Sequence, residues 1–174
     1  MKKFLPVLLI LLSLLSLNCG YTTSSALPGN FRTIYVADFK NKIDFTTERK
    51  RDIYFPLLEV SVRDAVVDRF MFDGNLRIAR EGEADLVMTG ELIDYNRGAL
   101  RYTDDDEVEE YRIQIIVDIV LNDTAQDEVV WRQRIIGEAT YFVTGALATT
   151  ETGAVDDAKV DLARRVVERT IENW

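Results

Sequence analysis

Apolar and polar residues alternate most regularly between Tyr111 and Leu121. Apolar side chains occupy every odd position of this stretch, and Arg112, Gln114 and Asp118 lie between them. A period of two directs successive side chains to opposite faces of a β-strand. The stretch therefore predicts a long strand with one apolar, buried face.

Two further stretches, 85–95 and 129–143, are also rich in apolar residues, and a polar turn over 122–127 precedes the second one. Three long strands in succession predict an antiparallel meander with projecting hairpin tips. Residues 33–39 are apolar on both faces, which is typical of a strand that is central or covered on both sides. Residues 75–79 are compatible with one more short strand.

Two segments show the three- and four-residue spacing of amphipathic helices. The first runs from Pro56 to Asp73, with a proline suited to the first turn and Gly74 suited to the position after the end. The second runs over 152–174, with acidic residues near its start and arginines near its end, as the helix dipole favours. The apolar positions of the first helix are Leu58, Val62, Ala65, Val66 and Phe70, and those of the second are Val155, Ala158, Leu162, Val166, Ile171 and Trp174.

The order strand, helix, strands, helix predicts an α+β fold. We expect two helices packed on one face of a four- to five-stranded mixed, mostly antiparallel sheet. A right-handed crossover through the first helix would place strand 33–39 parallel to a later strand.

The chain begins with two lysines and an apolar run from Phe4 to Leu17. A basic start followed by a short apolar stretch is typical of a secretory signal. The run is shorter than the roughly 20 residues of a membrane-spanning helix. We therefore predict a signal peptide over residues 1–18.

Cys19 is the only cysteine and directly follows this run. Three interpretations are open: an intermolecular disulfide, an unused thiol inside a removed signal peptide, or a cysteine lipidated at its sulfur. The position resembles the lipobox of bacterial lipoproteins, although Ser16 stands where that pattern has Leu and Asn18 where it has Gly or Ala. We expect Cys19 to be lipidated, residues 19–32 to form a tether, and residues 33–174 to form a single domain.

Charge and composition exclude several classes of function. Removing Lys2 and Lys3 with the signal leaves 19 basic residues against 30 acidic ones, a net charge of −11. This charge argues against nucleic-acid binding, because phosphates require a basic face. The chain contains no histidine, which excludes histidine-based catalysis and histidine metal sites. We expect no enzymatic activity, no metal and no cofactor.

Charged clusters concentrate around one hairpin. The run 104–107 lacks the spacing of a calcium loop and is interpreted as a solvated hairpin tip that discourages edge pairing. Arg97, Arg101 and Arg112 flank it. They are candidate ligands for a phosphate or carboxylate, and the alternative is local pairing with the acidic residues beside them.

Other side chains carry weaker indications. The loop Glu48–Arg51 is interpreted as solvated surface, with a basic patch for an anion as the alternative. Arg132 and Arg134 share one face of a strand, where they could cover the open side of the sheet or meet a partner. Trp131, Tyr141 and Phe142 are interpreted as packing residues, with an interface as the alternative.

The order of these elements resembles the LptE family of lipopolysaccharide-assembly lipoproteins. The residues that carry the resemblance are Cys19–Tyr21, Thr33–Asn41, Ala84–Leu92, Tyr111–Leu121 and Val129–Trp131, closed by an acidic, Ala-rich C-terminal helix. It covers nearly the whole chain after the signal.

The resemblance implies an outer-membrane lipoprotein, anchored at the periplasmic face, that plugs the LptD β-barrel and helps it assemble. It also implies lipopolysaccharide binding through basic residues at strand tips, which here would be Arg97 and Arg101, with Arg112 beside them. The loop from Val143 to Thr150 departs from the family pattern, because it contains no Lys or Arg.

Two other functions stay open. The first is an envelope scaffold or an activator of a peptidoglycan synthase built on a similar domain. The second is a carboxylate-based hydrolase, which for glycoside chemistry would need two acids about 5–10 Å apart in one pocket.

Overall fold

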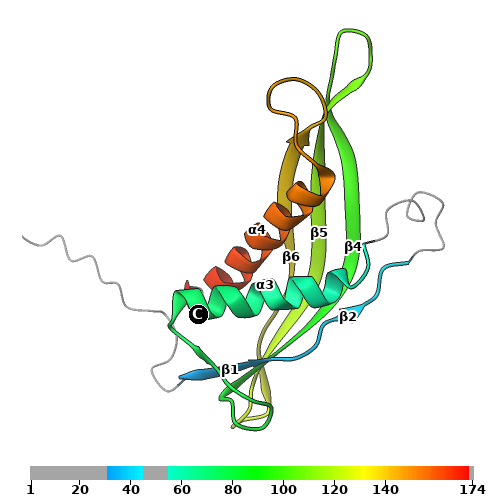
Figure 1. The fold of residues 1–174 in the computed structure, drawn as a ribbon. Helices are drawn as coiled ribbons and strands as arrows, with labels where there is room; N and C mark the ends of the chain where they lie inside the picture. Colours follow the sequence, from blue (N-terminus) through cyan, green and yellow to red (C-terminus); the bar gives the residue numbers. More distant parts are fainter. Residues whose placement is uncertain (1–30, 45–54, 173–174) are drawn as a thin grey trace, which may run out of the picture.

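A computed structural model describes residues 31–44 and 55–172 of the chain. The predicted signal, Cys19, most of the tether and the loop Glu48–Arg51 lie outside the described residues. Within them, two helices and one sheet form the predicted α+β fold (Figure 1).

The sheet has six strands in the order β3-β1-β4-β5-β6, with β2 pairing to β4. The three long strands β4, β5 and β6 form the expected antiparallel meander. The strands are β1 (Thr33–Val36), β2 (Lys40–Asn41), β3 (Arg77–Ile78), β4 (Leu86–Tyr102), β5 (Val108–Asp123) and β6 (Glu128–Phe142).

The expected parallel pairing is confirmed, because β1 runs parallel to both β3 and β4. Asp85 fastens the start of β1 to the start of β4. Its carboxylate accepts the backbone N–H groups of Arg32 at 2.7 Å and Thr33 at 2.9 Å, and the Thr33 hydroxyl at 2.9 Å. These hydrogen bonds lower the pKa of Asp85.

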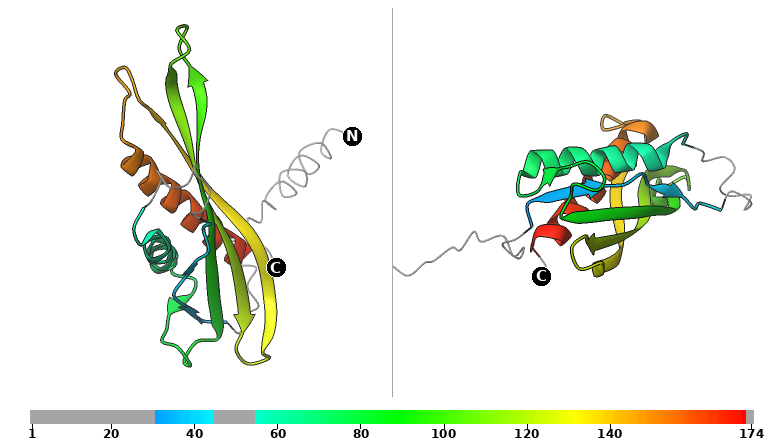
Figure 2. Two further views of the ribbon diagram at one scale, coloured as in Figure 1. Left: turned by 90° about the vertical axis from the view of Figure 1, so that its right-hand side faces the viewer. Right: turned by 90° about the horizontal axis from the view of Figure 1, so that it is seen from below.

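Both helices, α3 (Leu58–Asp73) and α4 (Glu151–Glu172), lie on the same face of the sheet (Figures 1 and 2). α3 ends at Gly74, which takes the left-handed conformation at φ 78° and donates its N–H to the Phe70 carbonyl. The predicted packing of two helices on one sheet face is thus confirmed.

The core lies between the helices and the sheet. The odd-numbered residues of β5 from Ile113 to Leu121 are fully buried on this side, which confirms the predicted alternation. Gly137 of β6 allows a close approach of α4, because a Cβ there would meet the Ala158 carbonyl oxygen and the Leu162 side chain.

Several boundaries differ from the prediction. The sheet has six strands and not four to five, because Lys40–Asn41, which lies beyond the predicted strand 33–39, pairs with β4. β4 and β5 extend beyond 85–95 and 111–121, because backbone pairing continues where the apolar pattern ends. The first helix begins at Leu58 and not at Pro56, since Leu57 adopts a left-handed conformation at φ 57°.

Candidate functional site

The β4–β5 hairpin projects beyond the start of α4 (Figure 2). All residues from Arg97 to Tyr102 are exposed, whereas the helix-facing residues of the same strand nearer its start are buried. The tip closes through a hydrogen bond from the Thr103 N–H to the Glu107 carbonyl at 2.7 Å, with Asp106 in the left-handed region at φ 61°. The acidic run 104–107 is therefore an exposed hairpin tip, as predicted.

Arg97 is held by the start of α4. One of its guanidinium nitrogens donates to Glu151 Oε2 at 2.7 Å, and its guanidinium lies 5.4 Å from the centre of the Tyr111 ring. Tyr95 donates its hydroxyl to Glu151 Oε1 at 2.9 Å, and the Tyr111 and Tyr141 rings stack at 5.6 Å. This group of five residues, here called the Glu151 cluster, joins three strands to the helix.

The electrostatics of the Glu151 cluster follow from burial and hydrogen bonding. Burial and the hydrogen bond to Glu151 raise the pKa of Tyr95. Burial, followed by the negative charge of Glu151, also raises the pKa of Tyr141. The hydrogen bond to Glu151 raises the pKa of Arg97. The two tyrosines therefore remain neutral donors around a charged pair.

Arg101 and Arg112 lie on the opposite side of the hairpin from Arg97. Gly98 pairs with Arg112, and Arg97 pairs with Ile113, so strand alternation sends Arg97 and Arg112 to opposite faces. A guanidinium nitrogen of Arg101 lies 3.6 Å from Glu110 Oε2, and Arg101 also covers the ring of Phe142.

A guanidinium nitrogen of Arg112 lies 3.7 Å from Glu138 Oε2, near the limit of an ion pair. The side chains of Arg101 and Arg112 are 58% and 48% exposed, against 35% for Arg97. The structure thus brings Arg101 and Arg112 to one face and separates Arg97 from them. Local pairing with the nearby acidic residues, the alternative interpretation, occurs for Arg101 and Glu110. The acidic partners of Arg112 and Arg97 are Glu138 and Glu151, which lie far from them in the sequence.

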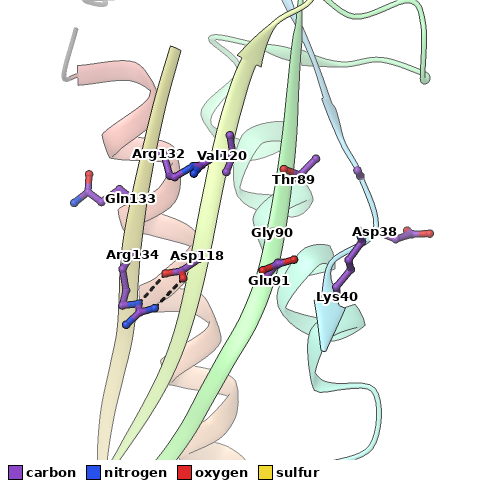
Figure 3. A pocket seen from close by; sticks show the side chains of 11 residues that line it. Asp38, Lys40, Thr89, Gly90, Glu91, Asp118, Val120, Arg132, Gln133 and Arg134 are labelled. Atoms are coloured by element: carbon purple, nitrogen blue, oxygen red, sulfur yellow. Dashed lines mark hydrogen bonds and ion pairs between the residues drawn. The ribbon is translucent and has the colours of Figure 1, made fainter. Parts of the chain in front are cut away.

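Figure 3 shows part of the sheet face that points away from the helices. A hollow of about 840 Å³ lies between the segment before β2 and the strand β6. Asp118 and Arg134 form a two-bond pair at 2.7 and 2.8 Å in it, and this pair lowers the pKa of Asp118. Asp118 is thus held as an anion, which does not suit the general acid that a glycoside hydrolase requires.

The aromatic residues of β6 behave as predicted. Trp131 and Tyr141 belong to the buried core, and Phe142 is partly buried beneath Arg101. Arg132 and Arg134 share the open face, also as predicted (Figure 3).

Residues 31–44 and 55–172 contain no cluster of three or more acidic, cysteine or histidine side chains able to hold a metal. Nor does any helix in that part of the chain have the length and apolar character needed to cross a membrane.

Comparison with known sequences decides the family. The model of the family described as "LptE: Lipopolysaccharide-assembly" matches residues 31–170. The chain belongs to the LptE family. The resemblance seen in its motifs is therefore confirmed, and its general function is lipopolysaccharide assembly as a lipoprotein of the cell envelope. No curated protein sequence matches the chain significantly.

Solved structures agree with this LptE-family fold. Uncharacterized lipoprotein B from Nitrosomonas europaea superposes with a TM-score of 0.55 at 11% identity, covering 81% of this chain and 83% of its own. A protein from Xanthomonas campestris gives a TM-score of 0.54 at 15% identity, covering 83% and 86%. A hypothetical protein from Chlamydia trachomatis gives 0.53 at 10% identity, covering 80% and 95%. At these identities the likeness concerns the fold alone.

Sequence reasoning missed Glu151 and Tyr95. The only signal for Glu151 was its place at the start of a helix, where the helix dipole favours an acidic residue. Nothing in the sequence linked Glu151 to Arg97, 54 residues earlier.

Proposed function

We propose that this LptE-family protein is lipidated at Cys19, anchored at the periplasmic face of the outer membrane, and inserted as a plug into an LptD-type β-barrel. The observation that carries the proposal is the family match over residues 31–170. In this role the protein helps the barrel assemble and assists the insertion of lipopolysaccharide into the outer leaflet. The division into signal 1–18, tether 19–32 and domain 33–174 is part of the same proposal.

The shape of the domain supports a plug. Three strands of 15 to 17 residues form a stiff wedge, and two helices brace one of its faces (Figure 1). An acyl anchor would confine this wedge to the membrane that holds the barrel, which raises its effective concentration there.

Lipopolysaccharide contact belongs to the proposal through Arg97, Arg101 and Arg112. Arg101 and Arg112 are the more accessible, because each is about half exposed and its acidic partner lies more than 3.5 Å away. A phosphate could replace those partners with closer, two-bond contacts. Arg97 would first have to leave Glu151. We therefore assign it a supporting role, in which it fixes the position of the hairpin relative to α4.

The barrel proposal is tested by affinity purification of the tagged full chain from mildly detergent-solubilised outer membrane, with mass spectrometry of the recovered proteins. We expect an LptD-type barrel in equal amount. A Cys19→Ser variant at the same expression level should recover much less of it. Recovery of peptidoglycan synthases without such a barrel would contradict the proposal.

Lipopolysaccharide contact is tested separately with the purified full chain. Replacing both Arg101 and Arg112 by Ala should weaken binding about tenfold per arginine, since a charge-assisted hydrogen bond contributes about 1.5 kcal/mol. Arg80→Ala is the matched control, because Arg80 is exposed in the turn between β3 and β4. Equal losses in the double variant and in the control would contradict a specific contact.

A further inference from the structure

β6 forms an edge of the sheet, and its outward backbone groups can be identified. The N–H of Glu138 donates to Asp161 Oδ2 at 3.0 Å, and the carbonyl of Phe142 accepts the Thr149 N–H at 2.9 Å. Both groups therefore point away from β5. The β5–β6 register is continuous over 131–142, so every even-numbered residue there directs its N–H and C=O outward.

This edge is protected at one end only. Asp161 and Thr149 cover the part next to the hairpin. Among the described residues, the outward N–H groups of Arg132, Arg134 and Ile136 receive no hydrogen-bond acceptor. A row of unpaired backbone groups on an edge strand is a template for pairing with another strand.

A groove runs beside the unprotected part of the edge. It has a volume of about 450 Å³ and lies between residues 133–138 of β6 and the C-terminal half of α4. Neighbouring strands in a sheet lie about 4.8 Å apart. A strand added to β6 would therefore occupy this groove, with α4 as its second wall.

The charge around the groove selects its occupant. Arg132 and Arg134 project from the open face, and Arg165 and Arg169 line the α4 wall. Arg132 has no ion-pair partner in the described residues, whereas the acidic Glu168 of the wall is already paired with Arg164 at 2.6 Å. Arg134 is paired with Asp118 at 2.7 Å, and Arg165 is paired with Asp161 at 2.7 Å. Arg132 therefore supplies a positive charge without an ion pair beside the edge, in a chain whose net charge is −9.

A second copy of this chain does not suit such an edge. Antiparallel pairing of two β6 strands around Arg134 would place arginines opposite or beside arginines, and like charges across a strand pair are destabilising. A segment with carboxylates at alternate positions would meet Arg132 and Arg134 on one side. If the segment were shifted by one residue, its carboxylates would face Arg165 and Arg169 on the α4 side of the edge.

We propose that the β6 edge from Arg132 to Ile136 binds an extended acidic segment of another protein as an added strand. The backbone of β6 supplies the hydrogen bonds, and the flanking arginines supply the preference for acidic side chains. This inference stands apart from the barrel proposal, because it concerns an edge of the sheet and not the anchor or the hairpin.

Two synthetic octapeptides with blocked ends test the inference on the full chain purified in detergent. One alternates Glu with Val, and the other alternates Lys with Val. We expect the Glu–Val peptide to bind at least about tenfold more tightly and to slow hydrogen exchange at the N–H groups of 132, 134 and 136. Equal affinity for both peptides, or protection only elsewhere, would overturn the proposal.

Matched variants separate the backbone from the side chain. Ile136→Pro removes an outward N–H without removing a bond to β5, and Ile136→Ala removes the side chain alone. The proline variant should bind the Glu–Val peptide about tenfold more weakly than the alanine variant. Arg132→Glu leaves the backbone intact and should shift the preference toward the Lys–Val peptide, which keeps the test decisive if the proline variant fails to fold. Slow exchange of these N–H groups without peptide, together with the mass of a dimer, would assign the edge to a second copy and overturn the proposal.

Discussion

The covered part of the meander and the projecting β4–β5 hairpin consist of the same strands but are stabilised differently. Where α3 and α4 cover the sheet, the odd residues of β5 from Ile113 to Leu121 are fully buried. Beyond that point, the residues of β4 from Arg97 to Tyr102 are exposed. The hairpin keeps its shape through strand pairing and a few charged and aromatic contacts, chiefly the Glu151 cluster.

The difference shows where changes are tolerated. Apolar burial contributes about 25 cal/mol per Å² and depends on close packing, so the covered part should respond strongly to small changes in volume. The hairpin buries little apolar surface and should respond weakly. Its exposed surface is therefore available for contacts with partners.

Glycine substitutions should show the difference between the two regions most clearly. Gly137→Ala should lower the free energy of unfolding by about 3 kcal/mol, because the new methyl group would push α4 away from β6. Gly98→Ala in the hairpin, where a Cβ meets nothing within 4 Å, should change it by less than about 0.5 kcal/mol. Urea unfolding followed by circular dichroism measures both. Similar effects at the two sites would show that the hairpin is as tightly packed as the core.

The Glu151 cluster should be the strongest contact of the hairpin root. Glu151→Ala should lower the free energy of unfolding by about 1.5 kcal/mol, since Tyr95 and Arg97 both lose their partner. A double-mutant cycle with Arg97→Ala should give a coupling energy of about 1 kcal/mol. The matched cycle of Arg112→Ala and Glu138→Ala should give a coupling energy of less than about 0.5 kcal/mol. The charged groups of that pair lie 3.7 Å apart, and their side chains are more exposed than those of Arg97 and Glu151. Equal coupling energies in the two cycles would contradict the prediction that Glu151 makes the strongest contact at the base of the hairpin.

Acid should destabilise the covered part through carboxylates with lowered pKa. Asp85 and Asp118 have this property through hydrogen bonds, and Asp161 has it because its bonds to Glu138, Arg164 and Arg165 outweigh its burial. A pKa below the unfolded value of 3.8 in the folded protein means that their stabilisation is present above that pH. It is lost as the pH falls through the folded pKa values.

Asp85→Asn isolates one of these contributions. It should lower the free energy of unfolding at pH 7 by about 1 kcal/mol and make the loss between pH 5 and pH 3 shallower. Glu83→Gln, exposed in the preceding turn, should leave the acid profile parallel to that of the unchanged protein. Parallel profiles for both variants would contradict the assignment.

The smallest effect on stability should come from the tip. Replacing Asp104 and Asp105 by Asn should change the free energy of unfolding by less than about 0.5 kcal/mol, because both side chains are exposed. Lipopolysaccharide affinity should rise about two- to threefold at low salt, since two negative charges near Arg101 are removed. An unchanged affinity at low salt would argue against binding near the tip.

Much of the fold could be predicted because its signals are local. Strand alternation over 111–121, the helical spacing of both helices and the glycine after α3 each reflect the geometry of a few neighbouring residues. The short β2 strand could not be predicted in this way. Two polar residues carry no periodicity, and only the neighbouring β4 backbone makes them a strand.

The helices, the long strands, the expected lipid anchor and the order of motifs typical of the LptE family can all be inferred from the sequence alone. How the three candidate arginines are used depends instead on the folded arrangement of the strands and α4. A register shift in β4 between Leu92 and Asp94 resets which side chains face the helices, so Arg97 turns toward α4 while Arg112 faces away. Its partner Glu151 is brought close by the packing of α4 across the sheet. A local pattern specifies alternation, but register and helix packing decide which charge meets which.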